Sequence, residues 1–432
     1  MRPLLCITLL AVIPIMAFAQ PPITKPRATS GDAIVEPDWT QRFSITVGPK
    51  DADIVGTTDK AIQAGVDYVA RFGGGTVKLL PGTYRLRNSV TMSSKVRLLG
   101  SGPDTILFKE PSITTKLADD SDWFDQEITL ANDKGFQIGD GVTLRAKGDG
   151  KSYEHYVKRT LIARIGNRFK LDKPLRDNFW RRGDAVVMSV FPLITGEFIS
   201  DLTIENLSLD GNRANNENLN GNYGGCIFFQ DCNRITIRGV HANNYNGDGI
   251  SWQICHDVLV ENCTAENNAQ LGLHPGSGSQ RPIIRNNTLK NNDIGLFFCW
   301  GIRHGLAEKN TITGNRVGVS IGHHDTDNLV LKNTINQSKT VGILFRPERG
   351  KEFAGHRNRI EQNKLIDNGA ADNAAAIDIQ GGTESITIVG NEITETRGSA
   401  QRVAVRMSKQ TRDITVRDNT IRGFLLDTET GK

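Results

Sequence analysis

The amino-acid sequence predicts an all-β protein in the form of a β-solenoid, and three observations lead to that fold class. A short phrase centred on Asn, or once on Gly, recurs about every 23 to 33 residues between Asn206 and Asn419. β-branched residues precede each copy, and Gly-led apolar runs follow it. One such repeat cannot bury its own apolar face, so consecutive repeats must stack as coils. The central residues of the copies are Asn206, Gly239, Asn262, Asn287, Asn310, Asn333, Asn363, Asn391 and Asn419.

A helical cap is predicted at the N-terminal end of the solenoid. Apolar residues recur at helical spacing over residues 59–72, and the glycines at 73–75 end the pattern. Such a helix would cover the exposed sheet edge with which a solenoid begins. The strands expected beside it are Thr76–Leu80, Thr83–Leu86, Val96–Leu99 and Thr105–Phe108. We assign residues 43–110 to this cap and the first coils.

Residues 111–195 interrupt the repeat, because no copy of the Asn phrase occurs there. We interpret this stretch as a β-rich insertion, or alternatively as early coils with long excursions. Its expected strands lie near Gln126–Leu130, Gly141–Arg145, Leu161–Leu171 and Ala185–Val190. The solenoid then occupies residues 196–432.

The first residues have the features of an export signal. Arg2 supplies the positive start, an apolar stretch follows, and Ala17-Phe18-Ala19 is a cleavage signal. We therefore expect a signal peptide over residues 1–19, cleaved near Ala19, and a linker rich in Pro, Thr and Ser over residues 20–42. No later segment is long and apolar enough to span a bilayer. The mature protein is expected to be secreted or periplasmic.

The charge balance and the cysteines narrow the class of protein further. The chain has 52 Lys and Arg against 48 Asp and Glu, which argues against a dedicated nucleic-acid binder. Beyond the leader the cysteines are Cys226, Cys232, Cys255, Cys263 and Cys299, an odd number, so at least one thiol is free. Cys232 and Cys255 occupy one column in neighbouring coils, where a disulfide or two stacked thiols are both geometrically open. We favour the stacked thiols.

The strand that follows each Asn phrase predicts which side chains face outward. Its second and fourth positions are almost uniformly large and apolar, so they line the interior, and the alternating positions face out. The expected outward residues are Phe228, Gln230, Ser251, Gln253, His274, Phe297, Ser320, Leu344, Arg346, Asp378, Gln380 and Arg406. A long ligand could lie along this outer sheet.

The opening of the fold resembles the right-handed parallel β-helix of the pectin lyase-like superfamily. The segments Gly73-Gly74-Gly75-Thr76-Val77 and Leu80-Pro81-Gly82-Thr83-Tyr84, after the helix, look like that superfamily's cap and first coil. The Asn phrases are also typical of it, and the resemblance covers about residues 51–424. It implies a right-handed parallel β-helix. The superfamily includes polysaccharide lyases, hydrolases and epimerases as well as phage tailspikes and adhesins, so the fold alone selects no reaction.

One segment resembles the polygalacturonase active site. Asn246-Gly247-Asp248-Gly249-Ile250 is similar to the Asn-Thr-Asp-Gly opening of that site, but the next coil lacks the expected Asp pair. Glu348 lies four coils from Asp248, roughly 19 Å along the axis. Paired glycosidase carboxylates lie roughly 5–10 Å apart. A hydrolase of the polygalacturonase type is therefore disfavoured.

A second segment is similar in outline to the Tyr-Gly-Phe-Asp-Pro-His segment of mannuronan C5-epimerases. In Leu271-Gly272-Leu273-His274-Pro275-Gly276 only Gly272 and Pro275 match identically. Leu271, His274 and Gly276 replace the Tyr, Asp and His of the motif. The resemblance therefore indicates where a site lies, without establishing its activity.

Ionisable and aromatic residues gather on five adjacent coils and form the candidate site. The candidate catalytic residues are His274, His323, Arg346 and Asp248, and the candidate substrate-binding residues are Trp300, His324, Tyr245, Glu348, Arg349 and Gln253. An Arg can bind a carboxylate through two hydrogen bonds and a His is a base near neutral pH, which suits proton abstraction beside a uronate carboxylate. His323 or Tyr245 would donate the second proton, and Trp300 suits stacking on a sugar face. A solvated sheet edge with no chemistry is the alternative.

A metal site is the other interpretation of these residues. His323-His324-Asp325 with Asp327 resembles a ligand cluster, but Asp327 shares a column with Arg281, His304 and Arg357, and a ladder of charges on turns explains that column. We therefore expect no metal and no cofactor. Calcium stays open as an alternative, although the outer face has few of the clustered acidic oxygens it requires.

The sequence thus predicts an exported carbohydrate-active enzyme that acts on an acidic polysaccharide as a lyase or an epimerase. One alternative is a β-helical glycoside hydrolase that uses Asp248 with a carboxylate brought in by a loop. The other is a secreted glycan-binding or surface protein without turnover.

Overall fold

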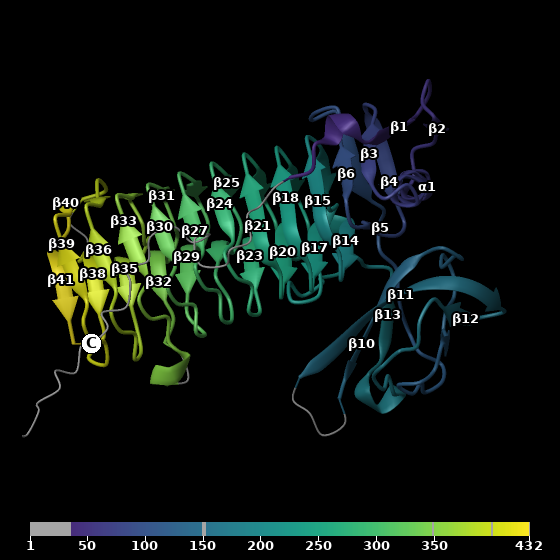
Figure 1. Cartoon of the computed structure of the whole chain (residues 1–432). Coiled ribbons are helices and arrows are strands. Elements are labelled where there is room, and N and C mark those ends of the chain that lie inside the picture. The colour runs from purple at the N-terminus through teal and green to yellow at the C-terminus, as the bar shows by residue number, and fades with distance from the viewer. Residues whose placement is uncertain (1–35, 149–152, 348–349, 399–400, 432) are drawn as a thin grey trace, which may run out of the picture.

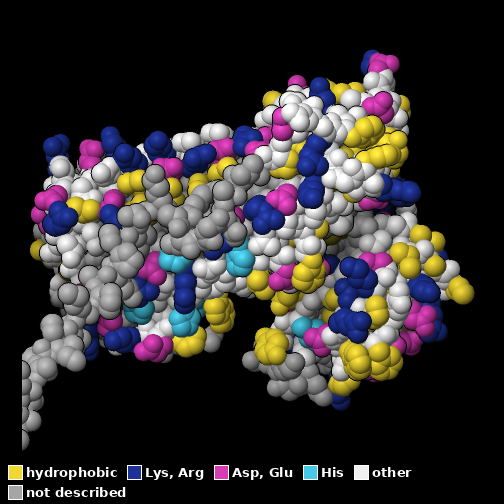
Figure 2. All heavy atoms as spheres, in the orientation of Figure 1, with side chains coloured by type: hydrophobic (Ala, Val, Ile, Leu, Met, Phe, Trp, Pro, Cys, Tyr) yellow, Lys and Arg dark blue, Asp and Glu magenta, His cyan; other side chains and the backbone are white. Residues whose placement is uncertain are grey.

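The computed structural model describes residues 36–148, 153–347, 350–398 and 401–431. The predicted signal peptide, part of the predicted linker, and Glu348 and Arg349 lie outside these residues. Within them, successive coils stack along one axis from the N-terminal cap to the last coil, and a separate lobe projects from the side (Figure 1). On the face drawn in Figure 2, acidic and basic side chains are interspersed along the solenoid.

Three long parallel sheets form the walls of the solenoid, because from residue 75 onward each coil contributes one strand to each sheet. Sheet I has 13 strands, in the order β2 (Ile54–Val55), β1 (Phe43–Gly48), β3 (Gly75–Leu79), β6 (Val96–Leu99), β15 (Ser200–Glu205), β18 (Asn233–Arg238), β21 (His256–Glu261), β24 (Ile283–Arg285), β27 (Leu306–Glu308), β30 (Leu329–Leu331), β33 (Arg359–Glu361), β36 (Thr387–Val389) and β39 (Thr415–Arg417). Sheet II has 11 strands, in the order β4 (Gly82–Leu86), β7 (Thr105–Lys109), β16 (Ser208–Asp210), β19 (His241–Asn243), β22 (Thr264–Glu266), β25 (Thr288–Lys290), β28 (Thr311–Thr313), β31 (Thr334–Asn336), β34 (Lys364–Ile366), β37 (Glu392–Thr394) and β40 (Thr420–Arg422). Sheet III also has 11, in the order β5 (Val90–Thr91), β14 (Ile194–Glu197), β17 (Ile227–Gln230), β20 (Ile250–Gln253), β23 (Leu271–Gly276), β26 (Ile294–Phe297), β29 (Val317–Ile321), β32 (Val341–Phe345), β35 (Ala375–Ile379), β38 (Val403–Met407) and β41 (Leu426–Thr430).

The alternation of sheet III follows the prediction from the sequence. Ile227, Ile250 and Leu273 are in register in consecutive strands and belong to one continuous core with the large rings of Trp252 and Phe298. The alternating positions face outward, but not all of them reach solvent. Phe228 and Ser251 are fully buried, because neighbouring segments cover this part of the sheet.

The repeated Asn phrase forms a buried hydrogen-bonded ladder, and here the predicted alignment needs a correction. From Asn287 onward each Asn side chain accepts a hydrogen bond from the backbone of the coil before, as from Cys263 N at 2.9 Å. Asn206 and Asn262 instead occupy the preceding left-handed turn position, with φ of 53° and 54°. The residues that follow them, Leu207 and Cys263, are buried at the position that the Asn of the ladder occupies in later coils. The prediction was off by one residue there because Asn suits both the left-handed turn and the ladder.

The predicted helical cap is α1 (Asp59–Ala70). Its face of Ile62, Val66 and Val69 is fully buried in the main core and packs on β1 and β3. The apolar spacing therefore places the helix over the first coil.

The side lobe is a six-stranded antiparallel sheet with a core of its own. Its strands follow the order β8 (Thr114–Lys116), β13 (Val186–Met188), β10 (Gly141–Lys147), β11 (Glu154–Ile165), β12 (Arg168–Leu171) and β9 (Glu127–Thr129). The single strand predicted over Leu161–Leu171 is wrong. Gly166 adopts a φ of 59° and turns the chain, so β11 and β12 form a hairpin.

Two further features bear on the predictions. Cys226, Cys232, Cys255 and Cys263 are buried as free thiols, and Cys299 is half-buried. None of the helices in the described part of the chain is long and apolar enough to cross a membrane.

Candidate functional site

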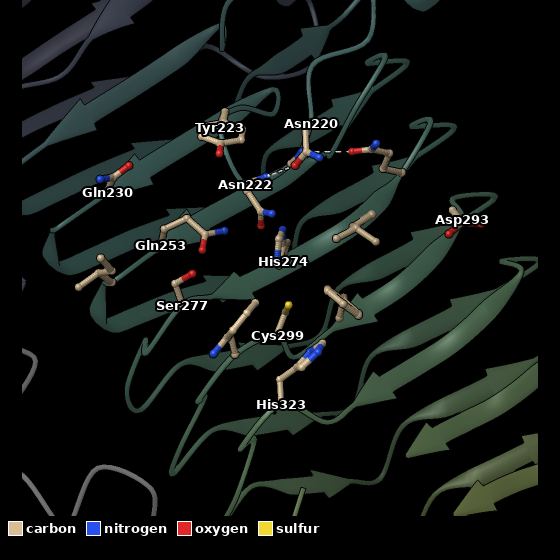
Figure 3. Close-up of a pocket in the computed structure, with 16 residues that line it drawn as sticks. Asn220, Asn222, Tyr223, Gln230, Gln253, His274, Ser277, Asp293, Cys299 and His323 are labelled. Carbon is tan, nitrogen blue, oxygen red and sulfur yellow. Dashed lines mark hydrogen bonds between the residues drawn. The ribbon is translucent and has the colours of Figure 1, made fainter. Parts of the chain in front are cut away.

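A pocket of about 680 Å³ lies on the outer face of sheet III. Its residues come from β17, β20, β23 and β26, from the turns on either side of these strands, from the turn after β29, and from the loop before β17. The lining residues are Asn220, Gly221, Asn222, Tyr223, Gln230, Gln253, Ile254, Gln270, Leu271, His274, Ser277, Asp293, Phe297, Cys299, Trp300 and His323. His274 lies in the middle of this group, close to Gln253, Asn222 and Cys299 (Figure 3).

His274 and Asp248 form a buried hydrogen-bonded pair at the floor of the pocket. Asp248 ends the turn before β20, and His274 projects outward from β23 in the next coil. Asp248 Oδ2 lies 2.8 Å from His274 Nδ1, and Asp248 Oδ1 accepts a hydrogen bond from Leu271 N at 3.0 Å. Asp248 is 0% and His274 2% exposed. The pair is therefore held rigidly, with one imidazole nitrogen already engaged.

Three buried polar atoms at this floor have no hydrogen-bond partner among the described residues. They are His274 Nε2 and both amide atoms of Gln253, Nε2 and Oε1. Gly276 makes room for the amide, since a Cβ there would lie 2.3 Å from Gln253 Nε2. Buried polar atoms normally have partners, so these atoms are suited to hydrogen-bonding a ligand.

A loop before β17 closes one side of the pocket. Gly221 donates its N–H to Gln270 Oε1 at 3.1 Å, and its carbonyl accepts from Ser251 Oγ at 2.8 Å. A Cβ on Gly221 would lie 1.9 Å from Asp248 Oδ2, so only Gly allows this approach. Tyr223, from the same loop, stacks on Tyr156 of β11 with ring centroids 4.6 Å apart. The side lobe thus supports the pocket wall.

On the other side of the pocket, Phe297 separates His274 from Arg346. Its ring centroid lies 5.3 Å from that of His274 and 4.5 Å from the guanidinium carbon of Arg346. The guanidinium donates to Ser320 Oγ at 2.8 Å and to Phe298 O at 3.1 Å, and it also meets Asp325 and His323 Nδ1, each at 3.2 Å. Burial raises the pKa of Asp325 to about 7, although Arg346 and two backbone N–H groups lower it.

Trp300 and His323 form the outer rim. Their rings stack with centroids 5.1 Å apart and an interplanar angle of 11°. Both residues adopt left-handed backbone conformations, with φ of 74° and 47°. Trp300 is 45% exposed at this rim.

The structure brings together only some of the residues predicted for the site. His274, Gln253, Trp300 and His323 line the pocket, and Asp248 lies directly behind His274. Tyr245 does not line it: the ring is buried in the main core and its hydroxyl donates to Phe191 O at 3.0 Å.

Arg346 and His324 also differ from the prediction. Arg346 was expected to bind a substrate carboxylate, but its guanidinium is engaged by protein groups behind Phe297 and does not line the pocket. His324 packs on Phe353 instead, with centroids 4.6 Å apart. Glu348 and Arg349 lie outside the described residues.

Sequence reasoning missed the polar wall of the pocket. Asn220, Asn222 and Tyr223 lie in a non-repeating loop, and Gln270, Ser277 and Cys299 lie at strand ends. The Asn- and Gly-rich run 218–225 was the one available signal of a special loop.

In the part of the chain that the structure describes, no group of three or more His, Cys, Asp or Glu side chains could hold a metal ion. Asp327, a predicted ligand in the metal alternative, pairs with Arg357 at 2.7 Å on the turn ladder. Arg281 pairs with Asp257 in the same way at 2.9 Å.

Comparison with known proteins finds a family model that matches part of the chain and solved structures that have a similar fold. Residues 182–373, less than half of the chain, match the model of a family described as periplasmic copper-binding protein (NosD). The described residues do not fit a copper ion, since they provide no cluster of His, Cys, Asp or Glu for it. No curated protein matches the chain in sequence.

Solved structures similar to this chain include two modules from Azotobacter vinelandii. The A-module of mannuronan C-5 epimerase AlgE4 has a TM-score of 0.55 and 16% identity, covering 89% of this chain and 97% of its own. The AlgE6 A-module has a TM-score of 0.54 and 16% identity, covering 89% and 99%. A family 28 exopolygalacturonase from Yersinia enterocolitica has a TM-score of 0.50 and 12% identity, covering 90% and 78%.

The three parallel sheets and these likenesses define the class of protein. It is a right-handed parallel β-helix with a pocket on one outer sheet. More particularly, the chain has the pectin lyase-like fold, with an α-helical cap and a β-rich side lobe.

Proposed function

We propose that the protein is an enzyme that abstracts a proton beside the carboxylate of a uronate in an acidic polysaccharide, as a lyase or an epimerase. The observation that supports this most directly is the Asp248–His274 pair at the pocket, in which His274 Nε2 is buried without a hydrogen-bond partner among the described residues. A carboxylate behind an imidazole fixes its tautomer and stabilises the cation that forms when the imidazole takes a proton. His274 Nε2 is then the base.

Gln253 would hydrogen-bond the substrate carboxylate. Its Nε2 is a buried donor without a partner among the described residues, and it lies beside His274. A donor positioned where charge develops stabilises the enolate that forms when the proton leaves C5. No Lys or Arg of the described chain lines the pocket, so the amide takes the role that the sequence suggested for Arg346. Trp300 offers a ring face for the sugar.

The two reactions differ in the fate of the enolate. In a lyase the bond from C4 to the glycosidic oxygen breaks and a donor protonates the leaving oxygen. In an epimerase a donor returns a proton to C5 on the opposite face. The similar epimerase modules are named for mannuronan, which supports a polyuronate as the first substrate to test.

A glycoside hydrolase is less well supported. Asp248 is fully buried and engaged by His274 and Leu271 N, so it cannot reach a glycosidic oxygen. The other acid at the pocket, Asp293, is paired with Arg316 at 2.5 Å. Most glycoside hydrolases use a pair of catalytic carboxylates.

We also infer export from the cytoplasm. The leader-like residues 1–19 and the match of residues 182–373 to a family described as periplasmic support it.

Incubation with a panel of polyuronates in D₂O tests the proposal. A lyase gives an unsaturated, ultraviolet-absorbing uronate, and an epimerase gives an inverted uronate carrying deuterium at C5. New reducing ends without either signal would indicate a hydrolase instead. Binding without any product would identify a glycan-binding protein and overturn the proposal.

A further inference from the structure

Two histidines at the pocket are held in opposite tautomers by the groups behind them. At His274, Asp248 Oδ2 at 2.8 Å and Ser251 Oγ at 3.3 Å both face Nδ1. The Ser251 hydroxyl donates its hydrogen to Gly221 O at 2.8 Å, so its oxygen can only accept a hydrogen bond from His274. In the neutral ring Nδ1 therefore carries the proton, and the buried Nε2 carries the lone pair.

His323 has the reverse arrangement. Arg346 Nη2 faces His323 Nδ1 at 3.2 Å, and a guanidinium has donors only. Nδ1 must accept, because a proton on it would point at the N–H of Arg346. The proton of this neutral ring is therefore on Nε2.

Arg346 holds this tautomer independently of any ligand. Ser320 Oγ and Phe298 O fix its guanidinium, and Asp325 Oδ2 faces it at 3.2 Å. The stacked Trp300 ring and the left-handed backbone at His323 then limit how the imidazole can turn. An imidazole with one nitrogen fixed as acceptor is a proton donor at the other.

The two imidazoles reach the pocket from different coils. His274 lies on β23 and His323 follows β29, two coils further on, roughly 10 Å along the axis. Both line the pocket, with Phe297 and Cys299 between them. A sugar ring bound there would have a proton acceptor toward one end and a proton donor toward the other.

We propose that His323 donates the second proton of the reaction from Nε2, and that Arg346 is the positioning residue that keeps His323 in the donating tautomer. This rests on the proposed function. His274 Nε2 takes the proton from C5, and His323 gives its Nε2 proton either to C5 on the opposite side or to the leaving oxygen of C4. His274 then returns a proton to solvent and His323 regains one, so protons balance over a turnover.

His323→Gln separates the two proton transfers. The Gln amide can donate a hydrogen bond but cannot release a proton, so product formation should fall by about 10²-fold or more. His274 can still remove and return a proton, so exchange of the C5 hydrogen for deuterium without product should persist. In His274→Gln both the exchange and the product should disappear. His241→Gln, at a half-exposed residue on β19 of another sheet, is the matched control and should behave like the natural protein.

Histidine ring ¹⁵N NMR tests the tautomers directly. The expected spectrum has an unprotonated Nε2 at His274 and an unprotonated Nδ1 at His323. Arg346→Met should move His323 toward the other tautomer and reduce product formation, and Arg346→Lys, which still donates, should restore part of both.

Three results would count against the inference. Product formation by His323→Gln within a few fold of the natural protein would overturn it and leave the proposed function standing. A protonated Nδ1 at His323 would do the same. Absence of any product or C5 exchange with the natural protein on every polyuronate would overturn the proposed function, and the role of His323 with it.

Discussion

Tyr223 stacks on Tyr156 with ring centroids 4.6 Å apart and an interplanar angle of 28°, and this contact joins the solenoid to its side lobe. Tyr223 belongs to the loop that walls the pocket, and Tyr156 belongs to β11 of the lobe. The lobe therefore helps to position a surface that any ligand on sheet III would touch.

Removal of this stacking contact should weaken substrate binding more than catalysis. Tyr156→Ala leaves Tyr223 without its ring partner, so the loop is expected to move and KM to rise several-fold, with a smaller change in kcat. Tyr156→Phe keeps the ring and loses only the hydroxyl that donates to Glu154 at 2.7 Å, so it is the matched control. Steady-state kinetics on a polyuronate measure both, and equal KM values for the two variants would contradict the role of the stack.

Asp248→Asn should prevent His274 from acting as the base, while it keeps a side chain of nearly the same size at position 248. An Asn amide can donate to His274 Nδ1, which forces the proton onto Nε2, so kcat is expected to fall by about 10²–10⁴-fold. Ser251→Ala removes only the more distant acceptor at 3.3 Å and should cost less. Kinetics together with histidine ¹⁵N shifts check this, and full activity in Asp248→Asn would show that His274 is not the base.

Gly276→Ala should act on substrate binding through Gln253. The new Cβ would lie 2.3 Å from Gln253 Nε2, so the amide must move away from His274. We expect kcat/KM to fall at least tenfold, because a misplaced donor no longer meets the developing charge. Gly350→Ala is the control, since a Cβ there meets nothing within 4 Å and its φ of 166° is extended. Unchanged kinetics in Gly276→Ala would remove Gln253 from the site.

Asp325 should make the protein more stable as pH falls from above 7 toward 4. Burial raises the pKa of Asp325 from 3.8 to about 7 in the folded state, so the folded protein binds this proton more tightly than the unfolded chain. The stabilisation is complete below the unfolded pKa and is lost as pH rises through about 7. Denaturant unfolding at several pH values should show this slope, and Asp325→Asn should flatten it. An identical slope in that variant would assign the pH dependence to other groups.

How much of the site could be predicted depended on whether the residues belong to the repeat. His274 and Gln253 were predicted to face outward because they occupy alternate positions of regular strands, and both line the pocket. Asn220 and Tyr223 were missed because their loop repeats nowhere else, and its position depends on Gln270 and Tyr156, far away in the sequence. Contacts of that kind have no local signature.

Arg346 and Tyr245 show that the role of a residue is equally hard to predict from the sequence. The sequence placed Arg346 near the site, but its partners Ser320, Phe298 and Asp325 come from other turns and use the donors that a substrate would need. Tyr245 sits in a turn, where strand alternation says nothing about direction, and its ring points into the core.

The sequence by itself determined the stacked coils, the cap helix and the outward face of sheet III, because apolar periodicity and recurrent turn residues act within each repeat and are copied along the chain. Only the tertiary structure decided which outward residues reach solvent, which line a pocket and which groups face Nδ1 of His274 and of His323. Those properties depend on what packs against a residue from another coil or from the side lobe, and such neighbours come together only when the whole chain folds.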